Sequence, residues 1–94
     1  MALVVKVVNG RAEEWENGSR KRSYGSNVVA GSTDGKLVAI VLKDGRVEEY
    51  VAGARIRSYG SNAVNVQVSG GTVAVTLSNG RVEEYVKGAK TRTY

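Results

Sequence analysis

The chain of 94 residues contains no cysteine, histidine, proline or phenylalanine. Without cysteine there can be no disulfide framework and no thiolate metal site, so packing and hydrogen bonds must hold the fold. Without histidine the chain lacks the commonest general base and the commonest transition-metal ligand. We therefore predict a non-enzymatic protein with no catalytic residues, no metal and no cofactor.

The remaining candidates for catalysis are adjacent glutamates. They are Glu13 with Glu14, Glu48 with Glu49, and Glu83 with Glu84. Neighbouring residues of a strand point to opposite faces, so such a pair cannot act together as acid and base. Residues 31–36, GSTDGK, are similar to a phosphate-binding loop, but Leu37 stands where Ser or Thr is needed. We interpret this segment as a hairpin turn.

Long apolar runs are also absent. None approaches the roughly 20 residues that span a bilayer, and residues 1–10, MALVVKVVNG, lack the features of a signal peptide. We therefore expect a soluble protein, located in the cytoplasm, with no membrane partner.

What the chain does contain is a repeat. Residues 45–62 read GRVEEYVAGARIRSYGSN, residues 80–94 read GRVEEYVKGAKTRTY, and residues 10–27 read GRAEEWENGSRKRSYGSN, so the phrase returns every 35 residues. Such a period is typical of repeat architectures. We expect a single domain over 1–94, with repeats at about 1–26, 27–61 and 62–94.

Each repeat is predicted to be an antiparallel meander of four strands, which makes the fold all-β. Asn-Gly and Asp-Gly dipeptides favour two-residue type I′ turns, and valine favours strands. The first repeat begins too late for its first strand, which leaves eleven strands. The expected strands are 3–8, 11–16, 19–24, 29–33, 37–43, 46–51, 54–59, 63–69, 72–78, 81–86 and 89–94.

Two-residue turns also predict cross-strand partners. In the outer hairpins they place Glu13 opposite Arg22, Glu48 opposite Arg57, and Glu83 opposite Arg92. The same register sets Arg11, Arg46 and Arg81 against Tyr24, Tyr59 and Tyr94 for cation-π contact, and sets Trp15, Tyr50 and Tyr85 opposite Val4, Ala39 and Ala74. We interpret these pairs as structural.

Residues 70–94, GGTVAVTLSNGRVEEYVKGAKTRTY, resemble the repeat of bacterial β-propellers of the quinoprotein-like and WD40-like type. The shared pattern is an apolar strand, an Asn-Gly turn, a strand ending near Tyr, and a Gly-containing turn. The Trp-Asp and Gly-His signatures are absent, and the period is shorter than the usual repeat of about 40 residues. The resemblance implies a propeller-like fold and a scaffold role. The close identity between repeats also fits an engineered or recently amplified repeat protein.

A propeller usually has four to eight blades, so a chain with fewer than three would close only as a homodimer or homotrimer. The leading hypothesis is therefore a structural, self-assembling protein that forms a closed homo-oligomer. Two other architectures are compatible with the pattern: a pseudo-threefold β-prism, and an up-and-down β-barrel with its apolar faces inward.

Two binding functions stay open as alternatives. A multivalent, lectin-like module would stack glycans or another small ligand on equivalent aromatic residues beside basic ones, which would be Trp15, Tyr50, Tyr85, Arg22, Arg57 and Arg92. A nucleic-acid partner would use the basic outer strands and the net charge of +5.

Overall fold

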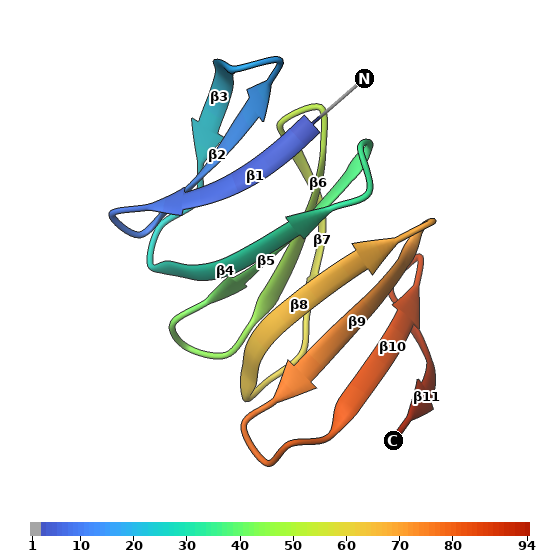
Figure 1. The fold of residues 1–94 in the computed structure, drawn as a ribbon. Coiled ribbons are helices and arrows are strands. Elements are labelled where there is room, and N and C mark those ends of the chain that lie inside the picture. The colour runs from blue at the N-terminus through green and yellow to red at the C-terminus, as the bar shows by residue number, and fades with distance from the viewer. Residues whose placement is uncertain (1–2) are drawn as a thin grey trace.

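The computed structural model describes residues 3–94, which form three antiparallel sheets (Figure 1). Within each sheet, neighbouring strands are consecutive in the chain. The first sheet comprises β1 (Leu3–Val8), β2 (Arg11–Glu16) and β3 (Ser19–Tyr24). The second comprises β4 (Val28–Thr33), β5 (Leu37–Leu42), β6 (Val47–Val51) and β7 (Ala54–Tyr59). The third comprises β8 (Ala63–Ser69), β9 (Thr72–Leu77), β10 (Val82–Val86) and β11 (Ala89–Thr93).

The predicted all-β fold of eleven antiparallel strands is confirmed over these residues. Strand ends differ from the expected ones by at most one residue, as at Val28, where β4 begins one residue earlier. The first sheet has three strands and β1 forms its edge.

The three sheets stack face to face in chain order, and the second lies between the other two (Figure 1). The first strand of the second sheet, β4, contacts both β1 and β8. The last strands, β3, β7 and β11, each pair with a single neighbour. The first strand of each sheet, β1, β4 or β8, is therefore its inner edge, where the sheets contact one another. The last two strands, β2–β3, β6–β7 or β10–β11, form what we name the outer hairpin.

The middle sheet is buried on both faces. Along β5, Val38 and Ile40 pack toward the first sheet, whereas Ala39 and Val41 pack toward the third. All four side chains are fully buried. An uninterrupted apolar strand is the pattern expected where a sheet has no solvent face.

Backbone contacts repeat where one sheet leads into the next. The amide of Val28 donates to the carbonyl of Gly10 at 2.9 Å, and the amide of Ala63 donates to the carbonyl of Gly45 at 3.0 Å. A Cβ on Gly45, whose φ is +91°, would lie 2.6 Å from the amide nitrogen of Asn62. Glycine is therefore required at this junction.

Asp34 joins the second sheet to the third. Its Oδ1 accepts from the amides of Lys36 and Leu37 at 3.0 and 2.8 Å, and its Oδ2 accepts from the amide of Gly71 at 2.9 Å. Burial alone would raise the pKa of this carboxyl, but the backbone donors outweigh it and lower the pKa. The segment 31–36 is therefore the end of β4 and a turn, as interpreted.

The turn that joins β1 to β2 differs from the equivalent turns that join β5 to β6 and β9 to β10. Asn9 and Gly10 both have positive φ, and the two-residue turn pairs Val8 with Arg11 as predicted. In the later copies only Gly45 and Gly80 have positive φ, and each donates its amide three residues back, at 2.9 Å. The amides of Leu42 and Leu77 donate to the carbonyls of Arg46 and Arg81 at 2.8 Å, so three loop residues separate each pair of bonded partners.

This longer loop shifts the predicted register by one residue. Tyr50 lies opposite Val38 and Tyr85 lies opposite Val73, so their expected pairing with alanines was wrong. A type I turn followed by a left-handed glycine accepts the same dipeptides as a type I′ turn. The side chain of Asp44 stabilises the alternative, because its Oδ1 accepts from the amide of Arg46 at 3.0 Å.

The predicted glutamate to arginine pairs in the outer hairpins were also wrong by one residue. The turns at Asn17-Gly18, Ala52-Gly53 and Lys87-Gly88 have the expected positive φ at both residues. A β-bulge then shifts each ladder. The observed partners are Glu14 with Arg22, Glu49 with Arg57, and Glu84 with Arg92 in place of Glu13, Glu48 and Glu83.

The cation-π prediction fails for the same reason. Tyr24 lies opposite Ala12 and not Arg11, and the Nε of Arg11 donates to the Oγ of Ser23 at 3.1 Å. Arg46 makes the equivalent bond to Ser58 at 3.0 Å.

Candidate assembly interface

One face of every outer hairpin carries a glutamate held by an arginine and a tyrosine, which we name the front triad. The three front triads are Glu14, Arg22 and Tyr24; Glu49, Arg57 and Tyr59; and Glu84, Arg92 and Tyr94. In each, the β-bulge puts the arginine opposite the glutamate and the tyrosine next to it on the same face.

The first two front triads are tight and covered. The Nη1 of Arg22 donates to Oε1 of Glu14 at 2.6 Å, and the hydroxyl of Tyr24 donates to Oε2 of the same carboxylate. Glu14 and Glu49 are among the largest fully buried side chains in the described residues. A buried carboxylate is tolerated only when its oxygens are paired in this way.

The third front triad is looser. The Nε of Arg92 lies 3.4 Å from Oε1 of Glu84, and the hydroxyl of Tyr94 donates to Oε2 at 2.6 Å. No sheet of the described chain packs in front of it.

The opposite face of each outer hairpin carries a second cluster, the rear triad. Its members are Glu13, Trp15 and Arg20; Glu48, Tyr50 and Arg55; and Glu83, Tyr85 and Lys90. The aromatic group donates to the glutamate, at 3.0 Å for Trp15, 2.9 Å for Tyr50 and 2.8 Å for Tyr85. The basic residue of the next strand pairs with the second carboxylate oxygen.

The front triad of one sheet meets the rear triad of the next through stacked tyrosines. The rings of Tyr24 and Tyr50 have centroids 4.2 Å apart and an interplanar angle of 19°. Tyr59 and Tyr85 repeat the contact at 4.3 Å and 30°. Such a pair contributes about 0.5–1.5 kcal/mol beyond area burial. The chain therefore makes one defined inter-sheet contact twice.

The arginine of each covered front triad packs over a glycine of the next sheet. A Cβ on Gly53 would lie 2.7 Å from Cδ of Arg22, and a Cβ on Gly88 would lie 2.8 Å from Cδ of Arg57. Both glycines have positive φ within type I′ turns. Two features of this turn therefore favour glycine: the left-handed conformation, and the space that the absent Cβ leaves for the arginine side chain.

Burial and hydrogen bonds to carboxylates keep the tyrosines neutral. Burial, followed by the bond to Glu14 or Glu49, raises the pKa of Tyr24 and Tyr59 far above the ordinary value. Burial and the bond to Glu83 raise the pKa of Tyr85 to about 12. These hydroxyls therefore act as hydrogen-bond donors across the physiological pH range.

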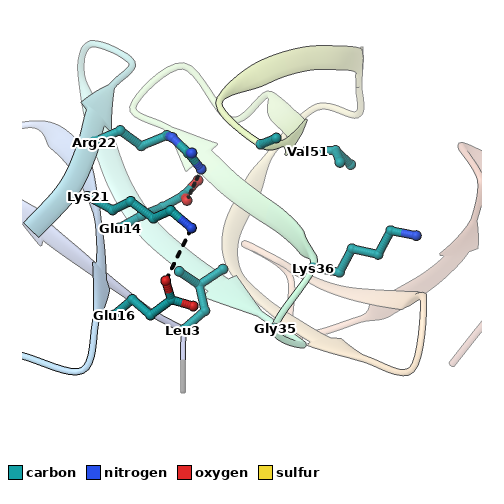
Figure 2. Close-up of a pocket in the computed structure, with 9 residues that line it drawn as sticks. Leu3, Glu14, Glu16, Lys21, Arg22, Gly35, Lys36 and Val51 are labelled. Atoms are coloured by element: carbon teal, nitrogen blue, oxygen red, sulfur yellow. Dashed lines mark hydrogen bonds and ion pairs between the residues drawn. The ribbon is translucent and has the colours of Figure 1, made fainter. Parts of the chain in front are cut away.

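A hollow of about 180 Å³ lies between the first two sheets, beside the first front triad (Figure 2). Arg22 bonds to Glu14 there, and the Nζ of Lys21 lies 3.2 Å from Oε1 of Glu16. Its lining is Leu3, Glu14, Glu16, Lys21, Arg22, Gly35, Lys36, Val51 and Ala52. Most of its charges are thus already paired. Within residues 3–94 no group of three or more acidic side chains could hold a metal ion.

The residues predicted for ligand binding do not form equivalent open sites. Tyr50 and Tyr85 are buried in the inter-sheet stacks. Arg22 and Arg57 cover glycine turns. Trp15 belongs to the rear triad of the first sheet and Arg92 to the front triad of the third, at opposite ends of the stack.

Sequence reasoning missed the front glutamates and the role of their tyrosines. A signal was present, because a glutamate is followed eight residues later by an arginine and ten residues later by a tyrosine in all three repeats. That spacing identifies the triad only when a one-residue bulge is allowed between the two strands.

These features define an all-β repeat protein built from stacked antiparallel sheets with a recurring inter-sheet contact. The family model described as Helicobacter pylori IceA2 protein matches residues 1–59 and again residues 44–94, which together span the whole chain. The chain belongs to this family.

Among solved structures, the chain is similar to one in the crystal structure of BBS1N in complex with ARL6DN, soaked with mercury. The TM-score is 0.72 at 21% sequence identity, and the match covers 92% of this chain but 33% of that one. This likeness is one of fold, and this chain spans about a third of the similar chain. A search of curated proteins finds no match. Over residues 3–94, the structure has no helix long and apolar enough to cross a membrane.

Proposed function

We propose that this chain is a non-enzymatic scaffold module whose activity is self-assembly into a closed homo-oligomer of propeller-like sheets. The observation that carries this proposal is the pentapeptide VEEYV, which forms both β6 and β10. Four of its five residues are buried in β6, but Tyr85 alone is buried in β10. The sequence is identical, so the difference comes from position in the stack.

The face left open on the third sheet has the character of an interface. The side chain of Glu49 is 1% exposed, whereas that of its counterpart Glu84 is 20% exposed. Tyr94 is 59% exposed although it holds the place of two covered tyrosines. Tyrosine and arginine are among the residues most enriched at the centres of protein interfaces. A further sheet placed here would bury groups that are already arranged to receive one.

The form of the contact is compatible with a ring. Each sheet presents its front to the rear of the next, which is a head-to-tail contact, and repeating such a contact gives a ring where the rotation closes and an open filament where it does not. Two chains would provide six sheets, within the four to eight blades of closed propellers, and three chains would provide nine. We therefore expect a homodimer, with a homotrimer as the next possibility.

Native mass spectrometry over a dilution series tests the proposal. We expect a single species at two or three times the chain mass of 10.0 kDa, persisting on dilution because both ends of every chain are engaged. A ladder of increasing masses would indicate open stacking and would contradict closure. A chain that remains at 10.0 kDa at all concentrations would contradict self-assembly.

A further inference from the structure

The two ends of the stack carry opposite halves of the contact that the chain makes twice internally. The third sheet ends on a front triad, with Tyr94 and Arg92, and no described residue covers it. The first sheet begins on a rear triad, with Trp15 at the position of Tyr50 and Tyr85. Each end thus lacks the partner that the other end presents.

The side chains of the front half are more exposed than their counterparts in the covered triads. The side chain of Arg92 is 68% exposed, compared with 30% for Arg57 in the covered triad. The pairing within the triad is kept, since Glu84 still accepts from Tyr94 at 2.6 Å. The front half is therefore assembled before any partner arrives, which lowers the ordering cost of binding.

The glycine turn of the rear half has the backbone conformation of a covered turn, and Lys6 lies over the neighbouring Trp15 ring, with its Nζ 5.7 Å from the centroid. The turn Asn17-Gly18 has φ values of 53° and 81°, and the covered turn Ala52-Gly53 has 53° and 84°. Yet a Cβ on Gly18 would meet nothing within 4 Å, whereas one on Gly53 would meet Arg22. The first sheet therefore has the same glycine turn on which an arginine packs in the other sheets, and no arginine of the described residues packs on it.

We propose that the occupant of each end is a second copy of this chain, with Tyr94 of one copy stacked on Trp15 of the other and Arg92 packed over Gly18. This inference rests on the proposed function and specifies its interface. Continuity with the two internal contacts supports it, because the same residue types at the same spacing already meet twice. Tryptophan offers a larger ring than tyrosine to both an aromatic and an arginine.

The contact is confined to the outer hairpins. Inside the chain, β8 also packs against β5, but the described first sheet has no strand inward of β1 to pack on β9 in this way. Each triad pairs one carboxylate with one cation, and Lys6 adds an exposed positive charge whose Nζ lies 5.7 Å from the centroid of the Trp15 ring. Because salt screens exposed charges, we expect the association to persist as salt is raised to physiological strength.

Two end-blocked variants test the contact. The front-blocked chain carries Tyr94→Ala, and the rear-blocked chain carries Trp15→Ala with Gly18→Asn, since asparagine accepts positive φ while its side chain fills the arginine seat. We expect each variant alone to lose the oligomer, and their equimolar mixture to regain a species of two chains and no larger one. Tyr94→Phe, which keeps the ring, should assemble like the unmodified chain.

Fluorescence reports the contact in the same mixture. Trp15 is the single tryptophan of the chain, so in the mixture only the front-blocked copy carries one. We expect its emission to shift to shorter wavelength when the rear-blocked copy is added, because Tyr94 of that copy would cover the indole. Circular dichroism of each variant checks that the strands are intact.

The outcomes separate this inference from the proposed function. If the unmodified chain assembles and both variants assemble equally well, the contact proposed here is wrong while self-assembly stands. If the variants are monomeric but the mixture neither associates nor shifts its emission, the contact is not head-to-tail. If the unmodified chain is itself monomeric, both proposals fail together.

Discussion

At the scale of the residue, each front glutamate is paired with both an arginine and a tyrosine. The glutamate is fully buried in one repeat and partly exposed in another, so the same interaction can be compared in two environments. Glu49 and Glu84 are such a pair, each holding an arginine and a tyrosine of the adjacent strand.

We predict that Glu49→Ala destabilises the dilute chain by about 2–4 kcal/mol, because Arg57 and the hydroxyl of Tyr59 lose their shared acceptor in a covered site. The matched change Glu84→Ala should cost less than about 1 kcal/mol, because solvent replaces the lost bonds. Urea unfolding of both variants at low concentration measures the difference. Equal costs would show that burial between sheets does not strengthen the triad.

The tyrosines provide a pH test. Their raised pKa values mean that stability from the neutral hydroxyls is fully present below the ordinary tyrosine pKa of about 10 and is lost as pH rises through the higher folded values. We predict that Tyr24 and Tyr59 ionise only as the chain unfolds at alkaline pH. Tyrosinate absorbance and circular dichroism should then change together. Ionisation of all five tyrosines near pH 10 with the sheets intact would contradict this.

At the scale of the element, the outer hairpin is the functional unit, because its two faces carry different triads. Two features favour glycine in its turn: the positive φ, and the space that an arginine of the preceding sheet needs. A comparison of Gly18 with Gly53 distinguishes these two features. Both glycines have the same backbone conformation, but of these two only Gly53 lies beneath an arginine of the described chain.

We predict that Gly53→Ala destabilises the dilute chain by about 1–2 kcal/mol more than Gly18→Ala. Both substitutions bear the cost of positive φ, and the additional cost at Gly53 comes from displacing Arg22, whose Cδ would lie 2.7 Å from the new Cβ. Thermal unfolding of the two variants provides the comparison. A Gly18→Ala variant that is equally or more destabilised would indicate that Arg22 moves aside freely.

The elements themselves were largely predictable, and so was the register between β1 and β2, but the register of the later inner turns and of the outer hairpins was not. Turn dipeptides and the repeat located all eleven strands, because glycine with asparagine or aspartate strongly favours tight turns. The same dipeptide at Asn79-Gly80 fits either a two-residue or a three-residue loop, and local sequence does not choose between them. Packing chooses, since the longer loop brings Tyr85 onto the same face as Val73 and into the inter-sheet core.

The candidate interface was hidden by a second register shift, which comes from the β-bulge in each outer hairpin. With Glu83 assigned to Arg92, the outer hairpin looks like a simple ladder of charge pairs on one face. The bulge moves Arg92 to Glu84 and leaves Glu83 to Tyr85 and Lys90, which creates two triads on opposite faces. A bulge of this kind has no dedicated sequence signal, because Thr91 at the extra position is an ordinary strand residue.

At the scale of the whole molecule, the chain is a short stack with unlike ends. The middle sheet has a sheet on each side and is the most deeply buried of the three: β5 is buried on both faces, and four residues of β6 are buried. The first and third sheets have one neighbour each. Adding a copy at either end would give the terminal sheets the surroundings that the middle sheet already has.

We propose that copies of this chain complete one another's ends. Sedimentation velocity of the unmodified chain over a hundredfold or similar range of concentration, at about physiological salt, measures this most directly. A discrete boundary at two or three times 10.0 kDa, unchanged by moderate salt, is the predicted result. A single boundary at 10.0 kDa throughout would contradict the claim.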